Sequence, residues 1–507
     1  MKVGRCCRVA VLALVAFLIP EGDARAESLR EAVEGILQRH DRILAAQADV
    51  SASEERVSER FKAGYLPTLN LTGHYGHERR MQKSSGTSTD MESRELDLRL
   101  TQLLWDFGKT GAAVDVARLQ KDQSLAALET ARQNLILDAA TAYYQLRRTN
   151  NVLRFARQSV ENIKKQGEVE DVRVALGRGY STDVLQVKTQ LAGARAREVQ
   201  ATGAVAQAEE RVRTVFLREA VEILKRSPPD ESFLKDLPKS VDDAVAMGIK
   251  KNPQLNQLRL VADMLKAQKR GVERNNFFPT VNGIVEHKFK DKVQGVDEFE
   301  DETFGKVEMT YPLNLGLSGL NGVSAAGQDL EASQRRYDDT RRLIEEQARV
   351  AWHNLNTARA NAELLNSQAN IAQKFLELAR EERKLDKRTL LDILNGETAL
   401  INARSDAASA DTDVIIAGFS LLQAMGALEP SVLETGKGAP KAEVINPLPP
   451  VVSGVKPAAA PEPAKAADDK KSGQASDKKS AAPSDKSAGK SAGKSESKKP
   501  AAQKSAP

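Results

Sequence analysis

The sequence predicts a mainly helical chain with four β-strands, built from two copies of one structural unit. Aromatic residues make up only 4% of the 507 residues, while Ala, Leu, Glu, Lys and Gln are abundant, a composition typical of long helices and coiled coils. Short motifs recur in the same order about 210 residues further along the chain, which indicates a duplication. Four segments alternate apolar and polar residues with a period of two, the pattern of strands with one apolar face.

The segment 1–26 is predicted to be an export signal. A basic start is followed by an apolar run at 9–19 and by a small-residue cleavage site ending at Ala26, which together describe a secretory signal peptide. The apolar run is too short to span a bilayer. Cys6 and Cys7 are the only cysteines and would leave with the signal, so the mature chain is expected to have no disulfide and no cysteine-based metal site.

The formal net charge of +5 is unevenly distributed along the chain. The segment 455–507 contributes +6 and the segment 1–26 contributes +2, so the body 27–454 carries −3. This body offers no basic surface for DNA or RNA, and no nucleic-acid partner is predicted. Residues 429–507 are rich in Lys, Ala, Ser and Pro and are expected to form a disordered tail. Contact of this tail with anionic cell-wall polymer or lipid headgroups stays open.

Five motif pairs define the duplication. Their first residues are Ser28 and Ser240, Tyr65 and Phe277, Trp105 and Leu313, Ala142 and Ala351, and Asp183 and Asp392. The offset is 212 residues for the first two pairs and 208 or 209 for the others. The first repeat is therefore placed at 27–226 and the second at 240–428, joined by a linker at 227–239.

Each repeat is expected to contain helix, strand, loop, strand, long helix, turn and helix. In the first repeat the alternating segments are 69–75 and 96–100. In the second repeat the strands are expected at about 280–290 and 303–312, with an acidic loop at 297–302 between them. Each strand would have one apolar and one polar face.

The long helices carry a heptad seam. Its apolar residues are spaced alternately by four and three at Ile344, Ala348, Ala351, Leu355, Ala358, Ala362 and Leu365. The first repeat carries the matching stripe Leu135, Ala139, Ala142 and Leu146. This spacing predicts left-handed coiled-coil packing. No proline interrupts 111–176, so one helix of about 100 Å is expected at 1.5 Å per residue.

The strands predict association of several chains. Four strands of about 9–12 residues can cross a thin bilayer when tilted, but lipid offers no partner for the free edges of a sheet. The smallest bacterial barrels have about eight strands, so at least two chains would have to combine their strands. Small and polar residues such as Thr72, His74 and Gly76 on the second face suit a water-filled interior, which favours three chains over two.

The strand entries and helical turns of this chain resemble those of the TolC-like outer-membrane efflux proteins, over about residues 27–428. The matching segments are Tyr65-Leu66-Pro67, Phe278-Pro279, Leu103-Leu104-Trp105-Asp106-Phe107-Gly108, Tyr180-Ser181-Thr182-Asp183-Val184-Leu185 and Arg388-Thr389-Leu390-Leu391-Asp392-Ile393-Leu394. The resemblance implies a homotrimer in outer-membrane lipid, whose 12-stranded β-barrel continues into a periplasmic α-barrel of coiled-coil hairpins. It also implies the exit duct of a tripartite efflux or type I secretion system. Such a duct docks with a periplasmic adaptor (membrane fusion) protein and an inner-membrane RND or ABC transporter.

The resemblance also implies a periplasmic gate at the two helical turns. Carried over by position, its residues are Thr182, Asp183, Arg383, Arg388, Asp392 and Asn395. Arg388 is expected to link to the backbone of Thr182 or to Asp183. Arg383 stands where the family has a tyrosine in the closing network, and it is expected to pair with Asp183 as well.

Acidic rings are the second part of this implied gate. Three copies of Asp392 around an axis would attract cations and repel anions. The family's second acidic ring falls on Asn395, so this chain would carry one ring instead of two. A weaker block by cations is therefore expected.

No catalytic, cofactor or metal site is predicted, and the chain is not expected to be an enzyme. The sequence has five histidines and no readable Ser/His/Asp arrangement. His74 and His77 are three residues apart on a strand, so they face opposite ways. Two alternatives to a channel remain: a soluble periplasmic coiled-coil scaffold, and a cell-wall-associated structural protein that acts through the lysine-rich tail. The exported cargo stays open.

Overall fold

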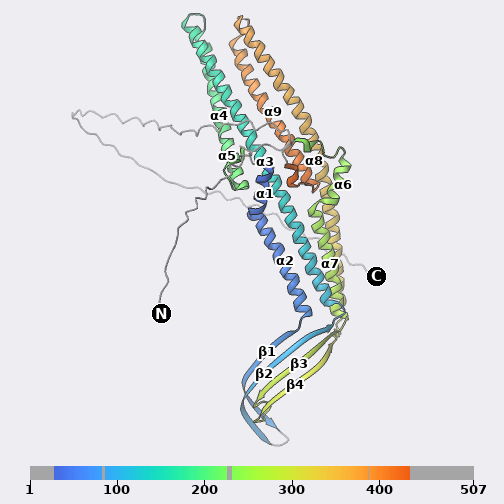
Figure 1. The fold of residues 1–507 in the computed structure, drawn as a ribbon. Helices are drawn as coiled ribbons and strands as arrows, with labels where there is room; N and C mark the ends of the chain where they lie inside the picture. Colours follow the sequence, from blue (N-terminus) through green and yellow to red (C-terminus); the bar gives the residue numbers. More distant parts are fainter. Residues whose placement is uncertain (1–27, 83–85, 225–230, 386, 434–507) are drawn as a thin grey trace, which may run out of the picture. The chain divides into compact units, whose positions relative to one another are not determined.

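The computed structural model describes residues 28–82, 86–224, 231–385 and 387–433 (Figure 1). The predicted signal, and the predicted tail beyond residue 433, lie outside these residues. The described part belongs to one compact unit. Its helices and strands are α1 (Leu29–Arg39), α2 (Asp41–Tyr65), β1 (Thr68–Gln82), β2 (Thr87–Trp105), α3 (Lys109–Ala175), α4 (Ser181–Phe216), α5 (Ala220–Leu224), η1 (Glu231–Leu234), α6 (Val241–Lys251), α7 (Pro253–Phe277), β3 (Thr280–Asp291), β4 (Phe299–Thr310), α8 (Ser318–Lys384), α9 (Leu390–Ala424) and η2 (Pro430–Leu433).

The two halves of the chain contain elements of the same order and nearly the same length. Helices α3 and α8 each span 67 residues, which is roughly 100 Å at 1.5 Å per residue. Helices α2 and α7 each span 25 residues, and α1 and α6 each span 11. The predicted fold class, mainly helical with long helices and four antiparallel strands, is confirmed. No helix among the described residues has both the length and the apolar character needed to cross a membrane.

The opening helix of each half is broken in two, which differs from the single helix expected. In the first half His40 ends α1, and its Nδ1 accepts a hydrogen bond of 3.2 Å from the backbone N–H of Arg42 at the start of α2. In the second half Asn252 accepts from the N–H of Gln254 at 2.9 Å, and Pro253 is the first residue of α7. A capping side chain therefore restarts the helix at the same place in both halves.

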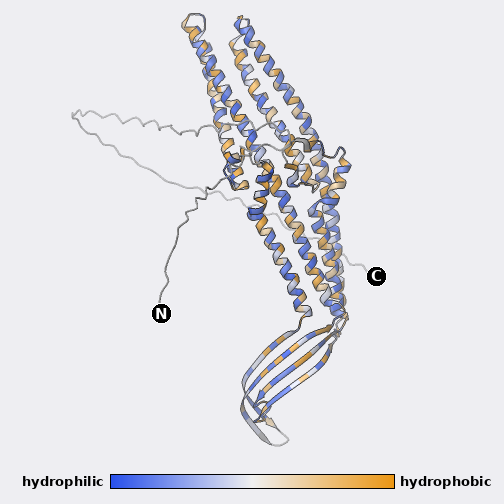
Figure 2. Ribbon diagram, viewed as in Figure 1, coloured by the Kyte–Doolittle hydropathy of each residue, from blue (hydrophilic) through white to orange (hydrophobic). Residues whose placement is uncertain are grey.

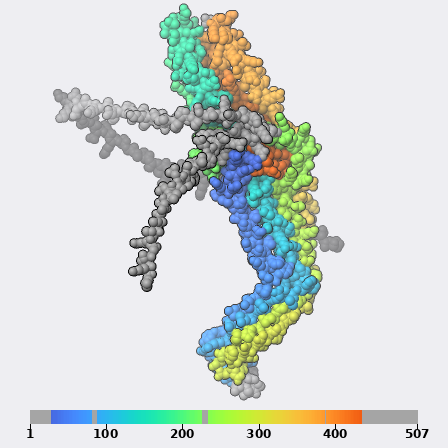
Figure 3. Space-filling model, viewed as in Figure 1, coloured from blue at the N-terminus to red at the C-terminus, as the bar shows by residue number. Residues whose placement is uncertain are grey.

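The four strands form one antiparallel sheet in the order β1-β2-β3-β4. The blue strands of the first half and the yellow-green strands of the second half form one continuous surface (Figure 3). Strand β4 begins at Phe299, four residues earlier than expected, so Glu300 and Glu302 belong to the strand and not to a loop. The cross-strand Lys290 explains this, because its Nζ lies 2.6 Å from Glu302 and 3.8 Å from Glu300.

The two faces of the sheet differ in polarity, as the period of two predicts. On one face Leu69 lies opposite Leu100, and the exposed apolar side chains there include Leu69, Leu71, Leu96, Leu100, Val285, Val307 and Met309. On the other face Arg99 lies opposite Glu286, and their side chains form an ion pair at 3.2 Å. Figure 2 shows the resulting alternation of polar and apolar residues along the strands.

The heptad seam is buried in α3 and is buried or half-buried in α8, as the predicted coiled-coil packing requires. In α8 the buried seam residues are Ile344, Ala348, Leu355 and Ala362, while Ala351, Ala358 and Leu365 are half-buried. In α3 the four seam residues are Leu135, Ala139, Ala142 and Leu146, none more than 2% exposed. Two alanines stand between successive large seam residues in both helices, and these small side chains allow the helices to approach closely.

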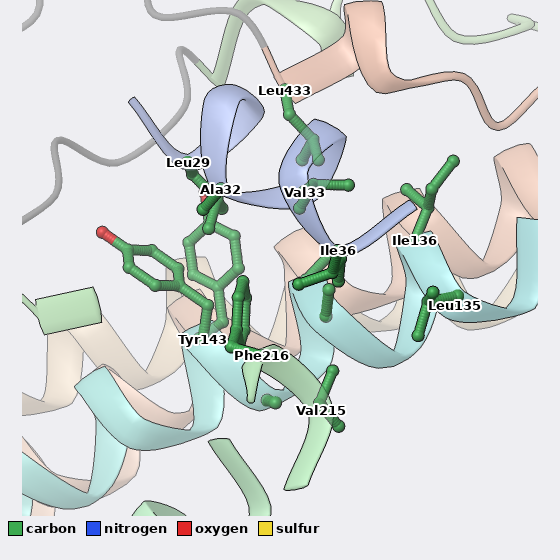
Figure 4. Close-up of a cluster of buried hydrophobic side chains, with 14 of the residues drawn as sticks. Leu29, Ala32, Val33, Ile36, Leu135, Ile136, Tyr143, Val215, Phe216 and Leu433 are labelled. Atoms are coloured by element: carbon green, nitrogen blue, oxygen red, sulfur yellow. The ribbon is translucent and has the colours of Figure 1, made fainter. Parts of the chain in front are cut away.

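The largest core cluster lies around α1, whose Leu29, Val33 and Ile36 pack against Tyr143 of α3 and Phe216 of α4 (Figure 4). Leu433 of η2 is fully buried in the same cluster. The predicted start of the tail at 429 is therefore too early, because the packed part of the chain extends at least to residue 433. Part of the predicted linker is packed too, since Phe233 stacks on Phe419 with ring centroids 4.6 Å apart.

Candidate functional site

All six predicted gate residues lie at the ends of the two helical hairpins, opposite the sheet (Figure 1). In the first hairpin, α3 ends in a turn where Gly177 has a φ of +72°, a conformation that glycine adopts without steric cost. In the second hairpin, Thr389 caps α9, and its Oγ1 accepts a 3.2 Å hydrogen bond from the N–H of Asp392.

Arg388 is held within the second hairpin. Its Nε donates to Glu382 at 2.6 Å, its Nη1 lies 3.9 Å from Asp392, and its guanidinium lies 5.6 Å from the ring centroid of Phe375. The hydrogen bond and charge of Glu382, helped by Asp392, raise the pKa of Arg388 above its usual value. The expected link from Arg388 to Thr182 or Asp183 is not made within this chain, because carboxylates of its own hairpin occupy the guanidinium.

Arg383 connects the two hairpins, but through Glu170 and not through Asp183 as expected. Its Nη2 lies 3.1 Å from Oε1 of Glu170 on α3, and its Nη1 donates to the backbone carbonyl of Arg388 at 2.9 Å. The Glu170 side chain is 2% exposed and also accepts from Gln166 at 3.2 Å. A buried carboxylate requires a cation and hydrogen-bond donors, and this requirement explains why Arg383 is directed to α3.

A second polar link lies about one helical turn further from the hairpin ends. Glu397 of α9 is buried, forms an ion pair with Arg380 of α8, and accepts a 3.3 Å hydrogen bond from Asn162 of α3. Apolar side chains surround these links, since Ile163 of α3 packs against Leu390 of α9. Burial of this kind strengthens a charge-assisted hydrogen bond because water is excluded.

The remaining predicted residues make no side-chain link within the described chain. Thr182 and Asn395 are exposed and Asp183 is half-buried. The backbone N–H of Asp183 donates to the carbonyl of Tyr180 at 3.0 Å, but no hydrogen bond or ion pair of the three side chains is found among the described residues. Their place in a gate stays a prediction.

Three carboxylates of these hairpins, Glu170, Glu382 and Glu397, were missed by reasoning from the sequence. The sequence pattern could have identified two of them. Glu170 stands seven residues after Ile163 on the seam of α3, and Glu397 stands seven residues after Leu390 on α9. An acidic residue at a heptad core position indicates a buried charge that needs a partner. Glu382 is half-exposed and carried no such signal.

The described residues contain no cluster of three His, Cys, Asp or Glu side chains that could hold a metal ion. In β1, His74 lies opposite Glu95 and His77 lies opposite Glu92, so the two histidines are on opposite faces of the sheet. They do not form a joint site.

Comparison with known proteins gives consistent matches for this fold. Residues 32–216 and 247–427 match the family model described as outer membrane efflux protein. The chain is 24% identical to the outer membrane protein TolC of Escherichia coli over 437 residues, covering 84% of this chain and 87% of TolC. It is 24% identical to the alkaline protease secretion protein AprF of Pseudomonas aeruginosa, covering 74% of this chain and 79% of AprF. The crystal structure of the CmeC outer membrane channel of Campylobacter jejuni superimposes with a TM-score of 0.68 at 14% identity, covering 80% of this chain and 86% of CmeC.

Long helical hairpins joined to a small sheet with an exposed apolar face define a class of outer-membrane channels whose helices lie in the periplasm. The chain belongs to the outer membrane efflux protein family. It is thus an efflux or secretion channel of the outer membrane, like TolC. Members of this family are transport proteins and not enzymes.

Proposed function

We propose that three copies of this chain form the exit duct of a tripartite efflux or type I secretion system. The observation that carries the proposal is the sheet, which has an exposed apolar face and two edges, β1 and β4, without a partner among the described residues. Hydrocarbon provides no hydrogen-bond partner for a free strand edge. Pairing β4 of one copy with β1 of the next removes every edge.

A trimer fits the chemistry of the second face better than a dimer. That face carries ion pairs such as Arg99–Glu286 and Lys290–Glu302, which require water or polar surroundings. An eight-stranded barrel is filled by its own side chains, whereas twelve strands leave room for water around these charges. The six hairpins of three copies, one from each of the repeats 27–226 and 240–428 of every copy, would form the periplasmic α-barrel.

The hairpin ends are proposed as the gate. Within each copy, the Arg383–Glu170 pair fastens the second hairpin to the first. The side chains of Thr182, Asp183 and Asn395 are left to meet neighbouring copies. Three copies of Asp392, each only partly neutralised by Arg388 at 3.9 Å, would form one acidic ring at the narrow end.

The proposed partners are a periplasmic adaptor (membrane fusion) protein and an inner-membrane RND or ABC transporter. Helices of roughly 100 Å extend far enough from the sheet to meet such an assembly in the periplasm. Members of this family are transport proteins and not enzymes, so the energy for transport would come from the transporter.

Conductance across a planar bilayer tests this function. The purified protein in detergent is expected to migrate as a trimer on an unheated gel and as a monomer after heating. It is expected to conduct weakly, with the current blocked by divalent cations added on the side of the hairpin ends. A detergent-free soluble monomer would contradict the proposal and favour the periplasmic scaffold. A channel that still exports cargo after deletion of 440–507 would contradict the cell-wall alternative.

A further inference from the structure

The connections between strands and long helices point to a specific contact between copies. Connection β2–α3 contains Asp106, Phe107 and Gly108, and its counterpart between β4 and α8 contains Asn314, Leu315 and Gly316 at an offset of 208. Both begin with the same turn. The Oδ1 of Asp106 accepts from the N–H of Gly108 at 2.9 Å, and the Oδ1 of Asn314 accepts from the N–H of Gly316 at 3.1 Å.

The first of these connections is covered within its own chain. The ring of Phe107 packs on Phe278, the residue that follows α7 just before β3, with centroids 5.4 Å apart. Beside this contact, Nη1 of Arg274 donates to the carbonyl of Gly108 at 2.9 Å. The contact therefore bridges the β2–β3 junction at the helical end of the sheet.

The second connection exposes the equivalent residue. Leu315, the counterpart of Phe107, is 96% exposed, against 42% for Phe107. The counterpart of Phe278, at an offset of 212, is Leu66 in front of β1, which is 51% exposed. Leu315 adjoins the free edge of β4 and Leu66 adjoins the free edge of β1, so one chain presents the two halves of the contact at opposite edges of its sheet.

We infer that Leu315 of one copy packs on Leu66 of the next copy, repeating between chains the Phe107–Phe278 contact that exists within each chain. This inference rests on the proposed ring of sheets and adds the contact that closes each junction at its helical end. When β4 pairs with β1 of the next copy in antiparallel fashion, the end of β4 and the start of β1 meet at the same level.

The hydrogen bond from Arg274 to Gly108 also has an expected equivalent between copies. The counterpart of Arg274 is Lys62, which stands in the last turn of α2 as Arg274 stands in the last turn of α7. The counterpart of Gly108 is Gly316. Lys62 is exposed and carries the same positive charge, so it supplies the donor for the carbonyl of Gly316 in the neighbouring copy.

Cysteine cross-linking of the full-length protein tests this contact. Cys6 and Cys7, both within the predicted signal, are the only cysteines of the sequence, so introduced cysteines report without a competing thiol. The variant Leu66→Cys/Leu315→Cys, oxidised in outer membranes and denatured under non-reducing conditions, is expected to run as covalent dimers and closed trimers. The single variants Leu66→Cys and Leu315→Cys are expected to stay monomeric, because the two positions meet only each other.

A second cysteine pair distinguishes failure of the contact from failure of the trimer. Val307→Cys and Tyr75→Cys lie on the same face of the two edge strands and correspond to Leu98 and His287, which face each other across β2 and β3. Cross-linking of this edge pair without cross-linking of the Leu66–Leu315 pair would overturn the contact and leave the ring of sheets standing. Failure of both pairs would overturn the ring and the contact together.

Lipid is the competing neighbour for Leu315. A fluorophore attached to Leu315→Cys is expected to resist quenching by brominated lipids, while the same fluorophore on Val307→Cys, on the exposed apolar face, is expected to be quenched. Equal quenching at the two positions would place Leu315 in lipid and overturn the inference.

Discussion

The two repeats have the same backbone plan but different charges at their hairpin ends. Helices α3 and α8 match in length residue for residue at an offset of 209. At that offset Glu170 corresponds to Ala379 and Arg383 corresponds to Val174. Glu170 therefore has no counterpart in the second repeat, and Arg383, the cation nearest to it, has no counterpart in the first repeat.

This difference shows how a duplicated chain acquires a link between its halves. Each repeat has kept one member of the pair and has an apolar residue, Ala379 or Val174, at the position of the other member. The second hairpin is also more heavily linked internally, through Arg388–Glu382 and Arg380–Glu397. In the turn of the first hairpin, no hydrogen bond or ion pair of the Thr182 and Asp183 side chains is found among the described residues.

The largest effect is expected from removing the cation of the second repeat. Arg383→Met leaves Glu170 buried with Arg173 at 3.8 Å as its nearest remaining charge. Loss of one partner of a buried pair costs roughly 3–5 kcal/mol. Faster amide exchange near residues 165–175 and 380–390, measured by mass spectrometry, and a higher single-channel conductance are expected.

The double variant Glu170→Met/Arg383→Met is the matched control for this prediction. It removes both charges and leaves apolar side chains of similar volume, which is often neutral for stability. Most of the amide protection is expected to return. A double variant as labile as Arg383→Met alone would refute the explanation by an unpaired buried charge.

The second prediction concerns the acidic ring. Asp392→Ala is expected to relieve block by divalent cations, and Asn395→Asp is expected to strengthen it by adding a second ring. One charge near a hydrated cation changes the interaction by about 1 kcal/mol, so the half-blocking concentration should change roughly fivefold per substitution. Single-channel current titrated with Mg²⁺ measures both. Asp411→Ala, on the same helix, serves as the control, and an equal shift in that variant would remove Asp392 from the gate.

The third prediction compares the strand-to-helix connections. Burial opposes ionisation of Asp106, but hydrogen bonds from the hydroxyl and N–H of Thr110 and from the N–H of Gly108 outweigh it and lower the pKa of Asp106 below its usual 3.8. Asp106→Ala is expected to lower the free energy of unfolding by about 1 kcal/mol at neutral pH. Asp106→Asn should cost less, because an amide oxygen still accepts, as Asn314 does in the second repeat.

The pH dependence of this effect has a defined sign. Since the pKa of Asp106 is lowered in the folded chain, its ionised form stabilises the fold above pH 3.8, and the contribution is lost as the pH falls below that value. The stability difference between the parent and Asp106→Ala, measured by denaturant titration, should shrink below pH 3.8. A constant difference down to pH 2 would contradict the role of the ionised carboxylate.

The smallest effect is expected at Arg388. Its partners are half-exposed carboxylates of its own hairpin, and such pairs contribute little. Arg388→Ser is expected to raise conductance by less than about twofold, well below the change caused by Arg383→Met. A larger effect of Arg388→Ser would indicate that Arg388 bridges to a neighbouring copy.

The helical seam and the two faces of the sheet were predictable because each depends on residues close together in the sequence. The steps of three and four from Ile344 to Leu365 specify one helical face, and the alternation around Leu69 and Leu100 specifies one strand face. The restart of the helix at His40 and Asn252 was missed, although Asn252 followed by Pro253 is a typical helix start.

The location of the predicted gate residues on the hairpins was predictable, but their contacts within the chain were not. The six predicted residues do lie at the hairpin ends, because the turns of each repeat have local signals such as Gly177 and Thr389. Within the chain, Arg383 pairs with Glu170 and not with Asp183 as expected. Glu170 is more than 200 residues away in the sequence, and nothing local determines which carboxylate of the first hairpin reaches the second.

Composition, periodicity and internal duplication alone therefore determined the long helices, the four strands and the repetition of one plan. These features are set locally, because the pattern of nearby residues decides whether a segment forms a helix or a strand. The tertiary structure alone decided which charges pair and which apolar residues stay uncovered, such as Arg383 with Glu170 and Leu315 at the edge of the sheet. Those outcomes depend on how the helices and strands of both repeats are placed around one another. A charge that this arrangement buries needs a partner, and an apolar residue that it leaves exposed can contact another chain.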